Sequence, residues 1–428
     1  MKIYDWKELV LIAREKSPYY KKLYGQLTDI DLKELSLQDI PVAGQSEFWQ
    51  ANTIKDNQLL TAAIDDGIVF KSGGTTGQPK FSVFTRDEWN TFTAVFGEGM
   101  GRIGLSKGDR IANLFYAGEL YASFTFIMKS IEACPVPTVQ FGISGAAAPG
   151  NILTTVDDFQ INVLAGLPTT ILNVAEHYAQ EPAAYPHIKV EKILFGGESM
   201  YPDQRQRLQS LFPGVIISSI GYASVDAGLL GYADQSCGLD EHRVFGKATI
   251  CEIVDETTLA PITEPDVPGI VLITNLTRAL MPIIRYPVGD IAIWKEPQSD
   301  QNNDRKFLIL GRSEEAARIG PVSLYYDDMR AFLGKADLGF GINAFQLVTR
   351  HFDTRDSLIL KIATSQTGLD HKSLEDKIIE LFNLERPMFA QAAAQKIIHP
   401  LSIEWAGTSD IEINPRTGKL RRVIDQRR

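Results

Sequence analysis

The sequence predicts an α/β protein with a large N-terminal domain of layered sheets and helices and a small, mobile α+β C-terminal domain. Three observations support this fold class. Short apolar runs alternate with helical segments between residues 110 and 220. Residues 244–294 then become rich in strand-forming residues. Finally, 428 residues exceed one ordinary core, and a polar run at 299–304 separates two parts of the chain.

The expected elements follow from the residue pattern in chain order. An apolar face from Trp6 to Leu23 predicts one N-terminal helix that ends near Gly25. Strands at 68–70 and 81–84 flank a loop rich in Gly and Thr, and Thr85 starts a helix with the spacing of a capping box. The alternating region adds strands at 110–115, 136–139, 161–166, 190–195 and 215–220, and helices at 169–178 and 203–212.

The last third of the chain is expected to contain the second domain. Prolines predict breaks in the strand-rich segment at Pro261, Pro265, Pro268 and Pro287. We place the boundary just after Gly311, so residues 1–311 and 312–428 form the two domains. A strand pair at 345–351 and 357–363 and a helix at 373–382 belong to the second.

Composition limits the classes of function. There are 43 Lys and Arg against 53 Asp and Glu, a net charge of −10, which argues against a nucleic-acid partner but not against nucleotide binding. The first ten residues carry charges where a signal peptide needs an apolar run, and no apolar stretch of about 18 residues favours a membrane span. Because three cysteines do not form a disulfide framework, we expect a cytoplasmic protein.

The most informative segment is the loop at 72–80. Its glycines let backbone N–H groups approach an anion, its hydroxyls add donors and its lysine adds a cation, so it suits phosphates. A Walker A loop would have Ser or Thr directly after the lysine, and a hairpin turn needs only about two to five residues. The candidate phosphate-binding residues are Ser72, Gly73, Gly74, Thr75, Thr76, Gly77 and Lys80.

This loop closely resembles the signature loop of the acyl-adenylate-forming superfamily, and the chain is most similar to its phenylacetate–CoA ligase branch. The resemblance implies ATP-dependent activation of a carboxylic acid as acyl-AMP, with Thr76 among the catalytic residues. It extends from about residue 10 to the C-terminus, and the further motifs follow in the family's order.

Two Gly-rich turns are similar to the family's adenine-binding segments. The resemblance implies that Tyr222 lies against adenine and that Asp226 ligates Mg²⁺, a hard cation that a carboxylate suits. Asp226 is one methylene shorter than the family's Glu, and Val225 replaces the usual Thr or Ser. Whether these departures reduce activity stays open. The nucleotide-binding candidates in the two turns are Gly197, Glu198, Gly221, Tyr222 and Ala223.

Three charged residues extend the resemblance toward the C-terminus. Asp290 resembles the acid that binds the ribose hydroxyls, although Pro287 departs from that motif, and Arg312 resembles the next ribose or phosphate contact. Lys419 resembles the adenylation lysine, which a mobile domain brings to the charge that develops in the transition state. A hinge near 312–314 is implied. Taken singly, Asp290 or Arg312 would be interpreted as part of a surface pair and Lys419 as part of a solvated basic tail, and only the ordered set of motifs outweighs this.

The segment after the 110–115 strand is where the ligase branch lines its acid pocket. Aromatic and small residues there favour a small aromatic carboxylic acid, although core packing explains each aromatic singly. The hinge acid would correspond to Glu314, whereas residues 318–321 correspond poorly to the stretch beside the family's CoA tunnel. The acid-pocket candidates are Tyr116, Ala117, Gly118, Tyr121 and Gly166.

Three functional hypotheses remain. The leading one is an acid–thiol ligase that uses ATP and Mg²⁺, with CoA as co-substrate. The second passes the acyl-AMP to a carrier protein, an amine or a reductase, as in relatives that activate phenazine-type acids for antibiotic biosynthesis. The third is a catalytically degenerate nucleotide-binding protein. The sequence leaves the acid, the acceptor and a homodimer open.

One further set of residues could bind a metal. Cys237, His242 and Cys251 carry the thiolate and imidazole groups that suit Zn²⁺. Their spacing fits no standard zinc pattern and a fourth ligand is missing, so buried thiols and a surface histidine are favoured.

Overall fold

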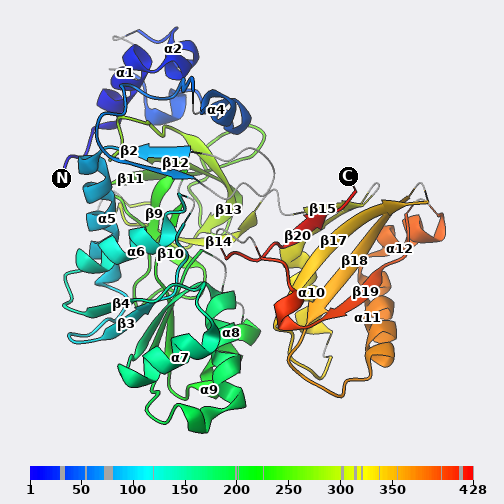
Figure 1. The fold of residues 1–428 in the computed structure, drawn as a ribbon. Helices are drawn as coiled ribbons and strands as arrows, with labels where there is room; N and C mark the ends of the chain where they lie inside the picture. Colours follow the sequence, from blue (N-terminus) through cyan, green and yellow to red (C-terminus); the bar gives the residue numbers. More distant parts are fainter. Residues whose placement is uncertain are drawn as a thin grey trace.

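The computed structural model describes residues 1–28, 34–53, 55–71, 81–118, 120–197, 200, 202–224, 226–299, 303–312, 316–319, 322–336, 338–353, 355–396, 398–413 and 418–427. Strands and helices from β15 onward, yellow to red in Figure 1, form a group beside a larger N-terminal part. The predicted α/β class with layered sheets and helices is confirmed. The boundary after Gly311 and the hinge stay predictions, because 313–315 lie outside the described residues.

The N-terminal helices form a cap at one end of the larger part (Figure 1). The prediction of a single helix is wrong, because Ser17 ends the first helix and its hydroxyl accepts a hydrogen bond from Tyr20 N at the start of the second. Pro18 at the first helical position reinforces that start. The elements are α1 (Trp6–Lys16), α2 (Pro18–Tyr24), η1 (Leu37–Asp39) and α4 (Gln45–Ala51).

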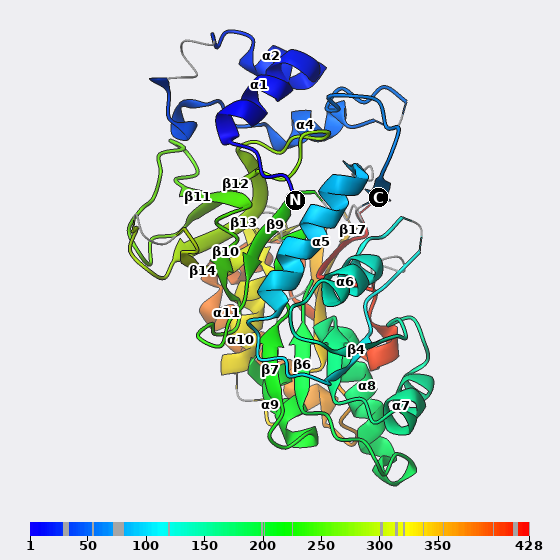
Figure 2. The same ribbon diagram turned by 90° about the vertical axis from the view of Figure 1, so that its left-hand side faces the viewer.

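A short hairpin and a long helix follow this cap. The two predicted strands are confirmed as β1 (Ile68–Lys71) and β2 (Phe81–Phe84), and the structure pairs them as an antiparallel hairpin. α5 (Arg86–Met100) begins with the predicted capping box, in which Glu88 N donates to Thr85 Oγ1 at 3.1 Å and Thr85 N donates to Glu88 Oε2 at 2.9 Å. Figure 2 shows α5 running along one side of the larger part.

The first large sheet has five parallel strands in the order β4-β3-β5-β6-β7. β3 has β4 on one side and β5 on the other, so the strand order reverses there; in such sheets ligands bind at the carboxyl ends beside this point. The strands are β3 (Arg110–Asn113), β4 (Val139–Gly142), β5 (Val163–Gly166), β6 (Lys192–Phe195) and β7 (Ile216–Ser219). The accompanying helices are α6 (Ser123–Glu132), α7 (Pro149–Asp158), α8 (Pro168–Gln180), η2 (Pro182–Ala184) and α9 (Pro202–Leu211).

One boundary in this sheet was predicted wrongly. The strand expected at 136–139 begins only at Val139. Pro137 lies within the expected span and has no N–H to donate to a neighbouring strand, which explains the later start. The remaining predicted strands of the region are confirmed with shorter bounds.

The second large sheet is antiparallel and has the order β11-β12-β13-β14-β10-β9-β8. Contrary to the prediction, Pro287 does not interrupt a strand. It lies inside β13 opposite Leu272, at the point where the register shifts. The proline is tolerated there because the ladder is already irregular. The strands are β8 (Tyr222–Ser224), β9 (Gly228–Tyr232), β10 (Glu241–Val244), β11 (Thr249–Val254), β12 (Gly269–Asn275), β13 (Tyr286–Trp294) and β14 (Lys306–Arg312).

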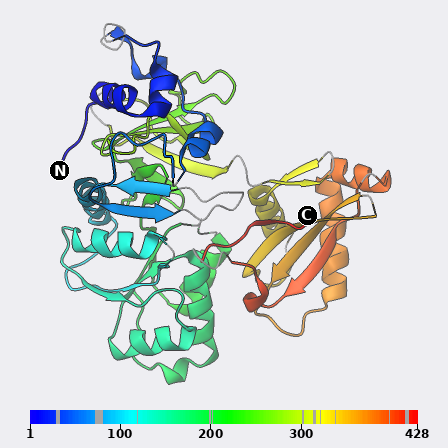
Figure 3. The ribbon, with the colours of Figure 1, turned by 45° about the horizontal axis from the view of Figure 1, so that its top comes forward.

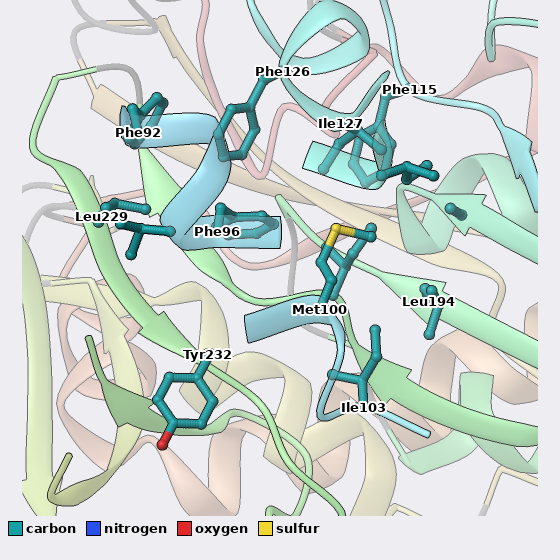
Figure 4. Close-up of a cluster of buried hydrophobic side chains, with 14 of the residues drawn as sticks. Phe92, Phe96, Met100, Ile103, Phe115, Phe126, Ile127, Leu194, Leu229 and Tyr232 are labelled. Atoms are coloured by element: carbon teal, nitrogen blue, oxygen red, sulfur yellow. The ribbon is translucent and has the colours of Figure 1, made fainter. Parts of the chain in front are cut away.

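An aromatic core joins the two large sheets. Apolar side chains of α5 and α6 meet side chains from both sheets in one buried cluster (Figure 4). The rings of Phe92 and Phe126 stack at 4.6 Å between centroids, and Phe96 lies 4.6 Å from Phe126. This packing holds the carboxyl ends of the parallel strands against the start of the second sheet.

The C-terminal strands and helices have a core of their own, which includes Phe345, Phe382 and Phe389. A hairpin pairs β15 (Ala316–Ile319) with β16 (Val322–Tyr325), and the predicted strand pair and helix are confirmed. The sheet order is β19-β18-β17-β20. The elements are α10 (Tyr326–Lys335), β17 (Ala344–Phe352), β18 (Arg355–Ala363), α11 (His371–Glu385), α12 (Pro387–Ala394), β19 (Ser402–Ala406), η3 (Thr408–Asp410) and β20 (Val423–Asp425).

Membrane-spanning helices were also sought. No helix in the described part of the chain combines the length and the apolar character needed to cross a bilayer.

Candidate active site

Two glycine turns lie side by side at the carboxyl edge of the parallel sheet. Gly197 follows β6 and Gly221 follows the neighbouring strand β7, and both have positive φ, 78° and 127°. A Cβ on Gly221 would lie 2.7 Å from Cζ of Phe96, so the backbone approaches the aromatic core too closely for a side chain. The structure thus brings together both turns predicted to bind adenine, whereas Glu198 lies outside the described residues.

The turn after β7 leads directly to a tyrosine–aspartate pair. The Tyr222 hydroxyl donates to Oδ2 of Asp290, which lies 68 residues later in β13. Asp290 is the register partner of Arg312 in β14. The residues predicted to bind adenine and ribose therefore converge in space, and Ala223, next to Tyr222 in β8, packs against the aromatic core. Their roles toward a nucleotide stay predictions.

Asp226 receives a hydrogen bond that the sequence did not predict. The hydroxyl of Tyr286, a buried residue of β13, donates to Asp226 Oδ2 at 3.4 Å. Trp49 Nε1 of α4 donates in turn to the Tyr286 hydroxyl at 2.6 Å. The N-terminal cap therefore helps to orient this carboxylate. Trp49 carried no signal in the sequence, and Tyr286 carried none beyond its place in the motif that ends at Asp290.

The donor set around Asp226 suits a metal that arrives with a nucleotide. No group of three His, Cys, Asp or Glu side chains that could hold a metal ion occurs among the described residues. Mg²⁺ in nucleotide sites usually keeps water ligands and binds substrate phosphates plus one or two carboxylates. Asp226 can supply one such oxygen. A single carboxylate fits Mg²⁺ that binds together with ATP, and it does not fit a metal site made of protein ligands alone.

A fully buried arginine links Asp226 to β2, the strand that follows the predicted phosphate-binding segment. Arg278 Nη2 donates to Ser82 Oγ and to Val83 O, both at 3.0 Å, and its Nη1 lies 3.4 Å from Asp226 O. Its guanidinium lies 4.0 Å from the centroid of the Phe84 ring. Residues 72–80, with the candidate phosphate-binding residues among them, lie outside the described ranges.

Burial lowers the pKa of Arg278 to about 10, while the nearby carboxylates of Glu88 and Asp226 oppose this shift. The side chain is therefore still a cation at neutral pH. Glu88 also accepts hydrogen bonds from the N–H groups of Ala279 and Leu280, at 2.7 and 2.8 Å. The acid of the capping box thus holds the backbone directly beside Arg278.

Arg278→Leu should lower the free energy of unfolding by about 3 kcal/mol or more, since it leaves the Ser82 hydroxyl and the Val83 carbonyl buried without their donor. Urea unfolding followed by circular dichroism measures this loss. Arg86→Leu is the matched control, because the Arg86 side chain is 74% exposed. Equal unfolding midpoints for the two variants would show that the buried hydrogen bonds contribute little.

His242 lies in the interior, so the prediction of a surface histidine is wrong. Its Nε2 lies 2.8 Å from Ser219 Oγ, which also accepts from Gly221 N at 3.2 Å, and its ring centroid is 5.6 Å from that of Tyr222. The imidazole of His242 is buried because it packs against the turn that contains Gly221. Cys237, Cys251 and His242, all described, form no three-residue metal group, and both thiols are partly buried. Burial raises the pKa of Cys237 to about 11.

His242 should make the stability of the protein depend on pH. Burial lowers its pKa from 6.5 to about 4. Above pH 6.5 the imidazole is neutral in both states, and between pH 6.5 and 4 only the unfolded chain takes up the proton, so stability falls by up to about 3 kcal/mol. Urea titrations of the wild type and His242→Gln at pH 7 and 4.5 measure this difference. An identical pH dependence in both proteins would contradict the prediction.

The candidate catalytic lysine reaches the first glycine turn. A Cβ on Gly197 would lie 3.4 Å from Lys419 Cε and 3.9 Å from its Nζ. Lys419 lies shortly before β20. Because β20 pairs in parallel with β17, this pairing fixes where the segment that carries Lys419 enters the C-terminal sheet. Figure 3 shows the red C-terminal trace extending from that sheet toward the larger part. Two motifs more than 200 residues apart therefore meet.

The acid-pocket candidates do not share one environment. Tyr116 is half-buried and Tyr121 is buried, whereas Ala117 and Gly118 are exposed. Gly166 is buried, and a Cβ there would lie 3.1 Å from Leu114 Cβ, so close packing already explains this glycine. The segment is tied to the hairpin, because Lys71 N at the end of β1 donates to Leu120 O at 2.9 Å. Their role in binding an acid stays a prediction.

Comparison with known proteins agrees with this geometry. Residues 42–280 match the family described as AMP-binding enzyme. A phenylacetate–coenzyme A ligase of Thermus thermophilus is 23% identical over 99% of this chain and 95% of its own length. An indoleacetate–lysine synthetase of Pseudomonas savastanoi is 30% identical over 43% of this chain and 42% of its own.

The same fold occurs in a crystal structure of a 2-hydroxyisobutyryl-CoA ligase in its postadenylation state, with a TM-score of 0.73 and 19% identity over 98% of this chain and 88% of the other. The family match covers more than half of the chain and contains both glycine turns and Asp226. The chain therefore belongs to the AMP-binding enzymes, as an acyl-adenylate-forming ligase similar to the phenylacetate–CoA ligases.

Proposed function

We propose that this enzyme activates a small aryl carboxylic acid with ATP and transfers the acyl group to the thiol of CoA. The observation that carries the proposal is the position of Lys419 beside the Gly197 turn. A cation delivered to a glycine turn at the carboxyl edge of the sheet suits a reaction in which charge develops on phosphoryl oxygens. Residues 1–311 would bind ATP and acid, and residues 312–428 would carry the lysine.

In the first step, a carboxylate oxygen attacks the α-phosphorus of ATP, the bond to pyrophosphate breaks, and acyl-AMP forms. Lys419 stabilises the charge on the α-phosphoryl oxygens and the leaving group, and Asp290 accepts from the ribose hydroxyls. Asp226 would hold Mg²⁺, which neutralises phosphate charge when bound. The loop at 72–80 would bind the phosphates through its backbone and hydroxyl groups.

In the second step, the CoA thiolate attacks the acyl carbonyl and AMP leaves, so the thioester forms without further ATP. Full-length similarity to a phenylacetate–coenzyme A ligase supports this acceptor. The similarity to indoleacetate–lysine synthetase favours a second candidate, in which an amine attacks the same acyl-AMP. Both of these relatives are named for an arylacetate, which supports an arylacetic acid as substrate in either case.

A pyrophosphate-release assay tests the proposal. The purified enzyme is given ATP, Mg²⁺ and one acid at a time, including phenylacetate, indoleacetate, benzoate and hexanoate, with CoA, lysine or neither. We expect release with an arylacetate, and a thioester product only when CoA is present. An amide product with lysine and no thioester would favour the second candidate. Absence of pyrophosphate with every acid would contradict acyl-adenylate formation.

A further inference from the structure

We propose that Tyr116 is a positioning residue for adenylation, because its ring is the surface on which Gly418 docks to bring Lys419 to the Gly197 turn. The inference rests on the proposed function and names a contact that the motifs do not predict. The two residues lie in different parts of the chain, Tyr116 after β3 and Gly418 shortly before β20.

The contact leaves no room for a side chain. A Cβ on Gly418 would lie no more than 2.5 Å from three carbons of the Tyr116 ring, a distance that real Cβ atoms do not show. The backbone of Gly418 therefore lies directly against the aromatic ring. Since Lys419 is the next residue, the position of the ring determines how far the lysine extends toward Gly197.

Tyr116 is held firmly from the larger part. Its carbonyl oxygen accepts from Phe124 N at 3.0 Å and from Ser123 Oγ at 3.1 Å at the start of α6. The backbone of Gly145 also approaches the ring, since a Cβ on Gly145 would lie 2.8 Å from Tyr116 Cε2. The ring also packs against the aromatic core. Because these contacts restrict movement of the ring, an added methyl group at residue 418 would displace the segment that carries Lys419.

The location of Tyr116 suggests what this contact achieves. It lies at the carboxyl end of β3, where the strand order reverses, in the segment proposed to bind the acid. The same side chain would therefore meet the acid and the lysine segment. Binding of the acid and positioning of Lys419 are therefore coupled through the Tyr116 ring. The lysine is positioned best when the segment proposed to bind the acid is ordered.

The chain offers a matched control for the required substitution. Gly418 has φ +68°, and alanine there is strained even without a neighbour. Gly368 has φ +77° in the same C-terminal part, and a Cβ there would meet no described atom within 4 Å. Alanine imposes similar backbone strain at both positions, but only at residue 418 does it collide with Tyr116.

The test compares Gly418→Ala, Gly368→Ala and the double variant Gly418→Ala/Tyr116→Ala by single-turnover formation of acyl-AMP. We expect Gly418→Ala to slow adenylation about tenfold or more, since misplacing a catalytic group has effects of that size. Gly368→Ala should match the wild type. Tyr116→Ala, measured alongside, should slow adenylation as well, and the double variant should be no slower than the slower of the two single variants, because both substitutions disturb the same contact. Conversion of supplied acyl-AMP and CoA into thioester should be unaffected by Gly418→Ala, because adenylation alone needs this contact.

Hydrogen–deuterium exchange provides a readout that does not depend on turnover. Gly418→Ala should increase exchange at amides of residues 116–124, and Gly368→Ala should not. Equal adenylation rates for Gly418→Ala and Gly368→Ala, or fully additive losses in the double variant, would overturn the proposal. If no acid yields pyrophosphate but exchange changes as expected, the contact stands and the proposed function fails.

Discussion

Lys419→Ala should lower the rate of acyl-AMP formation about a hundredfold or more, the scale expected for one lost transition-state donor, while ATP affinity changes little. The physical reason is that the lysine acts where charge develops during attack, and the loop at 72–80 and the glycine turns would still bind the nucleotide. Single-turnover pyrophosphate release measures the rate, and equilibrium titration with ATP measures the affinity.

Lys372→Ala is the control, because Lys372 is a lysine of the same part of the chain with a 77% exposed side chain in an i,i+4 pair with Asp376. Exposed pairs of this kind contribute little to stability. An adenylation rate in Lys419→Ala equal to that of the control would assign Lys419 to a solvated tail and favour the degenerate nucleotide-binding hypothesis.

Asp226→Ala should abolish Mg²⁺-dependent pyrophosphate release and leave the fold intact. The carboxylate is partly exposed and accepts a hydrogen bond from the buried Tyr286 hydroxyl. When the carboxylate is removed, this hydroxyl still accepts a hydrogen bond from Trp49 Nε1. Loss of the metal-binding oxygen would remove the neutralisation of phosphate charge. Pyrophosphate release is measured over a range of Mg²⁺ concentrations, and circular dichroism with urea unfolding tests the fold.

Two further variants sharpen this experiment. Glu256→Ala removes an exposed acid distant in sequence from the motifs and should behave as the wild type. Asp226→Glu introduces the glutamate that the acyl-adenylate-forming superfamily has at this position. This variant should retain measurable activity with an altered Mg²⁺ requirement. Wild-type turnover in Asp226→Ala would show that the metal is held elsewhere.

Several predictions made from the sequence succeeded because they depend on neighbouring residues. The capping box of Thr85 needs only Glu88 three positions later, and the strands β1 and β2 follow from two short apolar runs around a Gly-rich loop. Among the predictions that failed, one did so because a local capping signal interrupts the apolar face, and another because strand pairing tolerates a proline. Ser17 divided the first helix, and Pro287 was accepted into β13 at an irregular register.

The sequence by itself determined the α/β class, the order of the motifs and the residues proposed to perform adenylation. Only the tertiary structure decided which of them meet: Tyr222 with Asp290, Arg278 with Asp226, and Lys419 with Gly197. It also decided that His242 is buried. The reason is that motif chemistry and helix or strand periodicity are encoded locally, whereas each of these contacts depends on two packed sheets and on the docking of the C-terminal segment.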